Sequence, residues 1–509
     1  MVSYTRLYID LKLNTMITEN ESVRLILGLK LRNLRQQRNL SYQQLSDATK
    51  ITVSYLHDIE NGKKYPKTDK ILALGKVLGT DYDYLVSLTG DKKLQPLIDL
   101  ISSDFINVIP WEHFGIAPAS LLELFTNTPD KVTAFISTLV KISRAYHLTR
   151  ENFYTTALRS YQDIHNNYFE DLEVASRKFR EELSITETLP VSVHDLEQAL
   201  KEKYGILTDR KKMGSISSLG NIRSYYSAAK KILYINKQFS SGQEAFLLAR
   251  ELAFQFLDIT LRPFETIVQQ PSSFDQLLNN FRASYFAAAL LIPEDYFVED
   301  IKSISGNDKW DPAAWLQLLD KYNVSAEMLL QRLTNILPHH FSIDQLFFLR
   351  MSGSEKEGYE INKELHLSQL HNPHANLVNE HYCRRWLSVR LMQDVQQLPE
   401  KKKNKGSLID VQISHYWQTH NRYLCITLAK PKNKNSHETV SVTLGLLLDS
   451  SLMQLMRFVN DENIITRTVH TTCERCSIAG CKERAVPATY IVKKQKEQEV
   501  RTALEGLEQ

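Results

Sequence analysis

The chain of 509 residues has few cysteines, no long apolar run and no strong excess of charge. Five cysteines in a chain of this length do not make a disulfide framework, and they fit a reducing, cytoplasmic location. No apolar run approaches the ~18 residues that a membrane-spanning helix needs. The net charge of +3 is too small to indicate a nucleic-acid binder, so an argument for DNA binding has to be local.

The first 20 residues carry Asp10 and Lys12 within their apolar part and lack the apolar region of a signal peptide. Two interpretations stay open: a flexible arm over 1–20, or translation that starts at Met16. A hydrophobic fraction of 43% and a charged fraction of 24% are ordinary for globular proteins, and the length predicts about three to four domains.

Residues 21–90 show the pattern of a small helical domain. Leucines recur at helical spacing up to Leu34. A second helix is predicted after the N-cap Ser41, with Leu45 and Ala48 facing inward. After a short turn, Thr52 is expected to cap a third helix over 53–60, with Leu56 and Ile59 facing inward. Two short helices joined by a tight turn predict a helix-turn-helix.

This segment resembles the XRE family of helix-turn-helix regulators over about seventy residues, in the stretches Leu40–Ser46, Ile51–Ser54, Ile59–Gly62 and Ile71–Gly79. It departs from the family at Lys50, where a turn glycine is usual, and at Tyr42, often a glutamine. Lys50 must then adopt a left-handed conformation, or the turn differs. The resemblance implies that Val53, Ser54 and His57 face bases, whereas Thr52, Lys63 and Lys64 contact phosphates. The alternative is a helical domain for protein contacts.

Residues 91–190 carry helical periodicity without a chemical motif and are predicted to be a helical linker or dimerisation region. Helices are expected around Leu97–Val108, over Val132–Tyr146, and as one long charged helix over Thr149–Leu183. Pro190 follows a stretch rich in serine and threonine that is typical of a linker.

Residues 191–365 resemble the ImmA/IrrE metallopeptidase-like domain, in the helix Ser241–Phe254 and in the alanine-rich segment that ends at Pro293. The resemblance implies an H-E-x-x-H helix, but Arg250 and Phe254 stand at its histidine positions, and Asn280 stands at the third ligand position. Only Glu251 is kept. A catalytic zinc ion needs three protein ligands. We therefore expect a degenerate zincin-like domain without catalytic residues, reused as a binding pocket, in which Glu251 pairs with Arg250 or another cation.

Residues 366–509 are predicted to form an α+β domain that bears the cysteines. Strand-like runs at Arg422–Leu428 and Val440–Leu446 flank a polar loop and predict a hairpin, and the chain beyond Ile491 is expected to be helical. Cys473, Cys476 and Cys481 form a C-x-x-C-x-x-x-x-C motif. Thiolates at this spacing can hold either zinc or an iron–sulfur cluster.

This last domain resembles that of the short-chain fatty acyl-CoA regulators, in Cys383 with Trp386, in Val442–Gly445 and in the cysteine motif with Arg484, Ala485 and Pro487. The resemblance implies a [4Fe–4S] cluster on Cys383, Cys473, Cys476 and Cys481, with zinc as the alternative, and a short-chain acyl-CoA effector. Cys425 is expected to be a small buried hydrophobe. In a second arrangement Cys383 is structural and a histidine such as His381 joins the motif. In a third, the cysteines are a cluster of buried thiols without a metal.

The fold class predicted is mainly α with a smaller α+β part: a helix-turn-helix bundle, a helical linker, a degenerate zincin-like domain and a cysteine-bearing α+β domain. The order of domains predicts a dimeric or larger DNA-binding transcriptional regulator that senses acyl-CoA or redox state and controls genes of fatty-acid, propionate or acetate metabolism. The first alternative is a phage- or stress-type repressor tied to an ImmA-like peptidase. The second is a DNA-binding scaffold without a small ligand.

Overall fold

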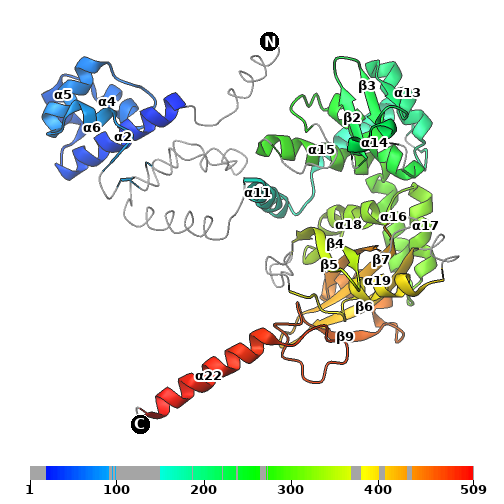
Figure 1. Ribbon diagram of the computed structural model, residues 1–509. Helices are drawn as coiled ribbons and strands as arrows, with labels where there is room; N and C mark the ends of the chain where they lie inside the picture. Colours follow the sequence, from blue (N-terminus) through cyan, green and yellow to red (C-terminus); the bar gives the residue numbers. More distant parts are fainter. Residues whose placement is uncertain are drawn as a thin grey trace. The chain divides into compact units, whose positions relative to one another are not determined.

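The computed structural model describes residues 19–90, 94–95, 98, 150–185, 187–220, 222–236, 239–263, 271, 273–367, 380–399, 407–432 and 438–507 (Figure 1). The chain divides into two compact units, one made of 1–161 with 269–277 and the other of 162–268 with 278–509. No helix among the described residues is long and apolar enough to cross a membrane. The expectations for 1–18, for most of Leu97–Val108 and for Val132–Tyr146 lie outside the described residues.

The smaller unit contains the helix-turn-helix. Its helices are α2 (Glu19–Gln37), α3 (Tyr42–Thr49), α4 (Val53–Glu60), α5 (Thr68–Leu78) and α6 (Tyr82–Val86). Leucine and isoleucine side chains of all five helices form one core. Gly28 lets α2 approach α4 closely, because a Cβ at this position would lie 2.5 Å from the Ile59 carbonyl oxygen.

The predicted caps of the motif are confirmed. The Ser41 hydroxyl accepts from the Gln44 amide while the Gln44 side chain accepts from the Ser41 amide, which is a complete capping box. The Thr52 hydroxyl accepts from the Tyr55 amide and caps α4. Lys50 adopts the left-handed conformation, with φ of 58°, that the missing turn glycine requires.

One inward position was predicted incorrectly. Ala48 is exposed, whereas Thr49 is buried and donates its hydroxyl to the Leu45 carbonyl at 2.7 Å. Thr49 follows Leu45 by four residues, and residues four apart lie on the same face of a helix, so both side chains point inward. Because its hydroxyl donates a hydrogen bond to a backbone carbonyl, Thr49 can be buried at the end of α3 although it is polar.

The single long helix predicted over Thr149–Leu183 is wrong. The structure has two helices, α11 (Arg150–Ile164) and α12 (Glu170–Glu182), separated by a turn in which Asn166 and Asn167 have positive φ. Asparagine tolerates this conformation better than most residues. The Asn167 side chain donates to the Thr334 hydroxyl at 2.8 Å, and its carbonyl accepts from Asn335. Buried contacts with residues far away in the sequence therefore hold this turn, and the spacing of apolar residues within 149–183 could not predict them.

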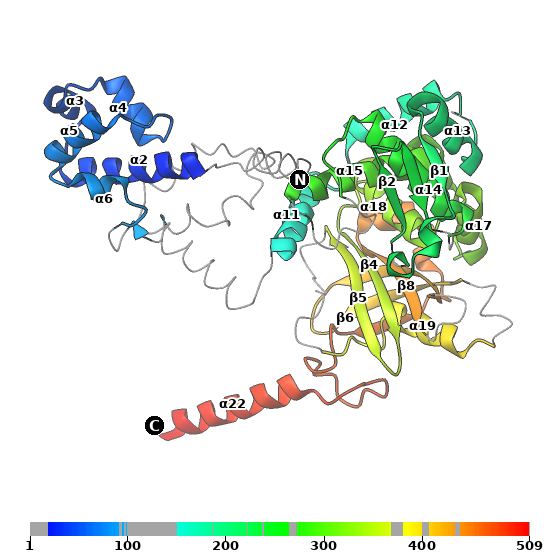
Figure 2. The ribbon, with the colours of Figure 1, turned by 45° about the horizontal axis from the view of Figure 1, so that its top comes forward.

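The zincin-like part of the larger unit begins with α13 (Val193–Tyr204) and a small sheet of β1 (Leu207–Asp209), β2 (Ser224–Ser227) and β3 (Ile232–Ile235) in the order β1-β3-β2. Figure 2 shows this sheet beside α13 and α14. The short 3₁₀ helices η2 (Met213–Ser215) and η3 (Ser217–Leu219) lie between β1 and β2 in the sequence. The remaining helices are α14 (Ser241–Phe256), α15 (Phe274–Leu291), α16 (Glu294–Ser305), α17 (Pro312–Tyr322) and α18 (Ala326–Phe341).

A six-stranded sheet follows, in the order β5-β4-β8-β7-β6-β9. Its strands are β4 (Leu346–Ser354), β5 (Gly358–His366), β6 (Leu408–Tyr416), β7 (Arg422–Pro431), β8 (Thr439–Leu447) and β9 (Thr466–Val469). Strands β7 and β8 pair antiparallel, which confirms the predicted hairpin. Helix α19 (Leu387–Gln397) precedes β6 in the sequence, whereas α21 (Ser450–Leu455) and η4 (Arg457–Asn460) follow β8. The predicted last helix is α22 (Thr489–Leu507).

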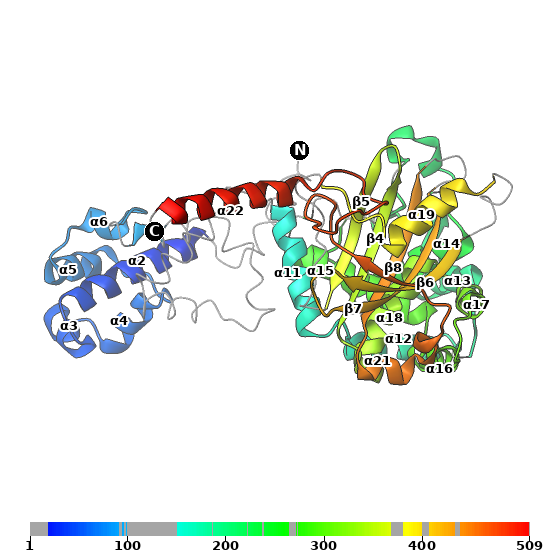
Figure 3. The same ribbon diagram turned by 90° about the horizontal axis from the view of Figure 1, so that it is seen from below.

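Both faces of this sheet are buried, and the side chains of β4 alternate between two cores. Leu346 and Phe348 join the core of the zincin-like helices, whereas Phe347 and Leu349 join the core that α19 covers. Figure 3 shows α18 and α19 on opposite sides of the sheet. The prediction of a helical majority with a smaller α+β part is confirmed. Residues of the predicted domains 191–365 and 366–509 thus share one hydrophobic core.

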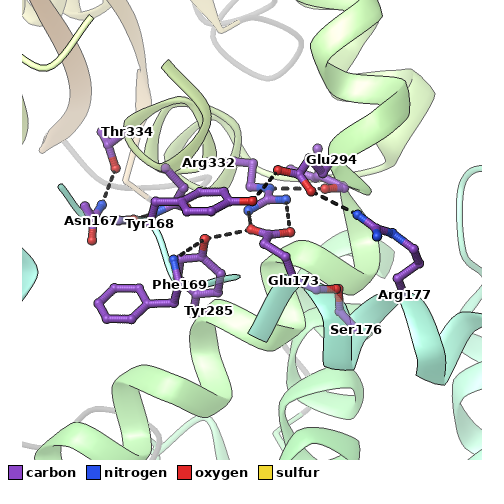
Figure 4. A network of polar contacts seen from close by, with 12 residues as sticks. Asn167, Tyr168, Phe169, Glu173, Ser176, Arg177, Tyr285, Glu294, Arg332 and Thr334 are labelled. Atoms are coloured by element: carbon purple, nitrogen blue, oxygen red, sulfur yellow. Dashed lines mark hydrogen bonds and ion pairs between the residues drawn. The ribbon is translucent and has the colours of Figure 1, made fainter. Parts of the chain in front are cut away.

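A buried ion pair fixes α12 against α18. Both nitrogens Nη1 and Nη2 of Arg332 contact the Glu173 carboxylate, at 2.5 and 2.8 Å, and Nε donates to the Ile292 carbonyl. The Tyr285 hydroxyl donates to Glu173 at 2.6 Å and accepts from the Phe169 amide. Figure 4 shows these side chains converging from three helices and the 165–169 turn. The Glu173 carboxylate raises the pKa of Arg332 against the opposing effect of burial.

We predict that Arg332→Met destabilises the larger unit by about 3–5 kcal/mol, because the Glu173 carboxylate would stay buried without its cation. The double variant Glu173→Leu/Arg332→Met should lose less stability than Arg332→Met, since no charge is then left buried. The midpoint of urea unfolding of the full chain measures both. Lys302→Met is the matched control, because Lys302 and its partner Glu299 are both exposed and the change should cost little. Equal losses in the single and double variants would contradict the prediction.

Candidate functional site

The exposed face of α4 carries the residues expected to read DNA. Val53 is 38% exposed, and Ser54 and His57 are also exposed, one turn apart. The His57 ring lies within 3.2 Å of the Asn61 side-chain amide nitrogen, which limits its orientation. Lys63 and Lys64 are exposed in the loop after α4, where both amides bind the Asp58 carbonyl. The smaller unit therefore brings the predicted base-facing residues together on one exposed face of a short helix.

A buried network that the sequence did not indicate supports this helix from behind. Arg35 binds both carboxylate oxygens of Glu60, the last residue of α4, at 2.7 and 2.9 Å. The Tyr42 hydroxyl donates to Glu60 at 2.8 Å, and the Arg35 guanidinium lies 4.0 Å from the Tyr42 ring centroid. Tyr42, the departure from the family pattern, thus joins α2, α3 and α4. Arg35, Tyr42 and Glu60 are separated in the sequence, and only the fold brings them into contact.

The four positions of the degenerate zinc motif also lie together. The Arg250 guanidinium binds the Asn280 side-chain oxygen and lies 5.0 Å from the Phe254 ring centroid. Glu251 pairs with Arg262, whose Nη1 lies 2.9 and 3.0 Å from the two carboxylate oxygens, and it also accepts from Gln255. The cation that pairs with Glu251 is therefore Arg262, which the sequence did not single out.

The charge at this position opposes a metal ion. Arg250 is 7% exposed, and burial lowers its pKa to about 10, so the guanidinium stays protonated at neutral pH. Arg262 adds a second cation against the Phe254 ring. Burial also raises the pKa of Glu251, against the lowering effect of Arg262. Two fixed positive charges and a phenyl ring replace the donors that zinc requires, so these residues do not fit a zinc ion.

The cysteine-bearing loops are joined by backbone hydrogen bonds. The Cys383 amide donates to the Thr471 carbonyl at 3.1 Å, and the Cys473 amide donates to the His381 carbonyl at 2.8 Å. Tyr382 and Thr472 form an isolated β-bridge between the same loops. Arg484 donates to the Cys473 and Cys476 carbonyls and closes the motif on itself. The structure thus brings Cys383 to the motif over about 90 residues of sequence.

The sulfur environment fits thiolate ligands. The Cys473 sulfur accepts the Ala485 amide at 3.4 Å, and the Cys383 sulfur accepts the Arg385 and His470 amides. Burial, and to a lesser degree the neighbouring Cys473 and Cys476, raises the pKa of Cys383 to about 11, which favours the neutral thiol in the absence of a cation. Among the described residues, no three of these sulfurs lie within 4.8 Å of one another.

The other candidate ligands lie differently. Cys481 is partly exposed at the end of the motif. Cys425 lies in β7, is 4% exposed, and donates to the Ser414 hydroxyl at 3.5 Å; burial raises its pKa to about 12. The His381 ring pairs with Glu474 at 2.8 Å. Cys425 is therefore held inside the sheet, and His381 is engaged by a carboxylate.

Two protein families match separate parts of the chain. The family described as helix-turn-helix domain matches residues 26–86, and the IrrE N-terminal-like domain matches residues 201–334. The chain therefore carries an XRE-type helix-turn-helix domain and an IrrE/ImmA-like domain, as the sequence predicted.

The relatives of this chain are bacterial regulators. It is 22% identical over 329 residues to the HTH-type transcriptional regulator RamB of Mycobacterium tuberculosis, covering 61% of this chain and 65% of RamB. It is 24% identical over 294 residues to the regulator PrpR of the same organism, covering 52% and 56%. The chain thus spans less than two thirds of either relative. A solved Mycobacterium tuberculosis transcriptional regulator aligns with a TM-score of 0.46 and 17% identity, over 65% of this chain and 92% of that one.

Proposed function

We propose that the protein is a sequence-specific DNA-binding transcriptional regulator that acts as a homodimer. The observation that carries the proposal is the exposed face of α4, which presents Val53, Ser54 and His57. The last residue of this helix, Glu60, forms a buried pair with Arg35. A helix with exposed side chains on one face suits the major groove. The matches to RamB and PrpR support a role in transcription. Two copies would bind two half-sites, as dimeric helix-turn-helix proteins do.

We predict a division of labour between base and phosphate contacts. Ser54→Ala/His57→Ala in the full chain should relax the sequence preference in a selection from random DNA, because these side chains face base edges. Lys63→Ala/Lys64→Ala should weaken binding to all sequences alike and reduce the slope of log affinity against log salt by about one per lysine.

Lys230→Ala is the matched control, since Lys230 is exposed in a turn of the larger unit. It should change neither the preference nor the slope. An unchanged preference in Ser54→Ala/His57→Ala, or a lysine variant that binds with the original salt slope, would count against this assignment. Thr52→Ala is less informative, because Thr52 also caps α4.

The cysteine site is proposed to hold a [4Fe–4S] cluster on Cys383, Cys473, Cys476 and Cys481, with zinc as the alternative. Four cysteines suit either group. The amide donors around Cys383 and Cys473 support the proposal, because hydrogen bonds to sulfur stabilise thiolate ligands and tune a cluster's potential. A bound cluster would supply redox sensitivity. The chain's own contribution is to hold two loops, 381–386 and 471–485, against each other.

We expect protein purified without oxygen to be brown and to contain iron and sulfide. Serine at any one of the four positions, Cys383, Cys473, Cys476 or Cys481, should bleach it, because each removes a ligand. Cys425→Ser is the matched control and should keep the colour, since Cys425 is enclosed in β7. Iron and sulfide analysis with the absorption spectrum measures the outcome. Colourless protein with one zinc ion per chain would keep the four-thiolate site and remove the redox role.

The effector is proposed to be a short-chain acyl-CoA, which rests on the resemblance of the domain order to the acyl-CoA regulators. Control of fatty-acid, propionate or acetate metabolism genes would follow from it. A ligand at about 100 times its Kd adds about 2.7 kcal/mol to the free energy of unfolding. We therefore predict a rise in melting temperature for one chain length between acetyl- and hexanoyl-CoA, with free CoA as the control. A flat profile across the series would remove the effector from the proposal.

The alternative is a stress-type repressor whose ImmA-like domain cleaves a partner. The match of residues 201–334 to the IrrE N-terminal-like domain supports this alternative at the level of the fold. Arg250, Phe254 and Asn280 weigh against it, because they form a closed set of contacts without a metal donor of the required kind. We therefore propose that the domain is not a peptidase. Zinc-dependent proteolysis that Glu251→Gln abolishes would reverse this conclusion.

A further inference from the structure

We propose that Glu294, His339 and His340 form a binding site for a divalent transition-metal ion of the zinc type, separate from both the cysteine motif and the zincin remnant. Among the described residues, these three are the group of histidine, cysteine, aspartate and glutamate side chains whose ligand atoms all lie within 4.8 Å of one another. Two imidazole nitrogens and one carboxylate oxygen are a donor set that zinc accepts while leaving a position open.

The three donors come from two helices that the fold holds in place. His339 and His340 lie in the last turn of α18, and Glu294 is the first residue of α16. Nε2 of His340 lies 2.6 Å from Oε1 of Glu294, and the two histidine rings are perpendicular, with centroids 4.8 Å apart. The carbonyl end of α18 carries partial negative charge, which favours a cation at this point.

Neighbouring side chains orient each donor. Tyr168 stacks on His339, with ring centroids 3.7 Å apart and planes 3° apart, and its hydroxyl donates to Oε1 of Glu294 at 2.8 Å. Arg177 donates to the other oxygen, Oε2, at 3.2 Å. Figure 4 shows Tyr168 and Arg177 reaching Glu294 from opposite sides. Groups that orient metal ligands in this way are a usual part of metal sites.

The Glu294 carboxylate is held in place by its neighbours. Its oxygens accept hydrogen bonds from Tyr168 and Arg177, and Nε2 of His340 lies within hydrogen-bond distance of Oε1. Glu294 is 7% exposed, whereas both histidines reach solvent. The site therefore combines one anchored anionic ligand with two accessible imidazoles. This donor set favours zinc, cobalt, nickel or copper over the oxygen-seeking magnesium and calcium.

The test uses the untagged full chain with zinc or cobalt(II) as the probe. We expect one ion per chain beyond any held by the cysteines, and this additional cobalt ion should add no further intensity to the sulfur-to-metal charge-transfer band. Glu294→Gln, His339→Ala and His340→Ala should each abolish this ion, and Tyr168→Phe should weaken its binding by about tenfold. His194→Ala, which removes an exposed histidine on α13, should leave it unchanged.

The controls separate the competing explanations. Each variant's melting temperature without metal establishes that it folds, and the rise on adding zinc should disappear with the ligands. A mere ion pair between His340 and Glu294 predicts that His340→Ala lowers the metal-free melting temperature and that no ion binds. That result would overturn the proposal, as would an ion that survives both histidine changes. Loss of the ion in Glu251→Gln instead would place it at the zincin remnant.

Discussion

The buried pair of Glu173 and Arg332 is the interaction on which the larger unit depends. One carboxylate receives two guanidinium nitrogens and a tyrosine hydroxyl, and that tyrosine in turn accepts an amide from the turn before α12. Helices α12, α15 and α18 therefore meet at one charged point inside an apolar core. The adjacent Glu294 group, with Tyr168 and Arg177 from the same turn and helix, lies at the edge of this arrangement.

Two buried carboxylates of the larger unit, Glu251 and Glu294, have different neighbours. At the zincin remnant, Arg250 and Arg262 supply the positive charge themselves, so Glu251 is neutralised without an ion. At Glu294 the neighbouring groups include the imidazoles of His339 and His340, whose ring nitrogens can act as metal ligands. The larger unit thus contains one carboxylate, Glu251, that is paired with a guanidinium group, and another, Glu294, that contacts an imidazole.

Sequence alone predicted the parts of the fold that follow from local rules. The caps at Ser41 and Thr52 and the β7–β8 hairpin depend on neighbours in sequence. The left-handed conformation of Lys50 was one of two possibilities that the sequence left open. Sequence alone failed at Ala48, where one step around a helix separates buried from exposed, and at 165–169, where Asn167 ends a helix through contacts with residues more than 160 positions away. The partner of Glu251 and the Glu294–His339–His340 group were missed for the same reason, because only the fold brings them together.

The sheet that is covered on both faces sets a limit on how such a chain can evolve. Alternate side chains of β4 belong to the α18 side and the α19 side. A cysteine-bearing tail from another protein could be joined here only if its strands presented the same apolar row toward α18. Exchange of tails between relatives should therefore preserve the residues of that row more strictly than those of the cysteine loops.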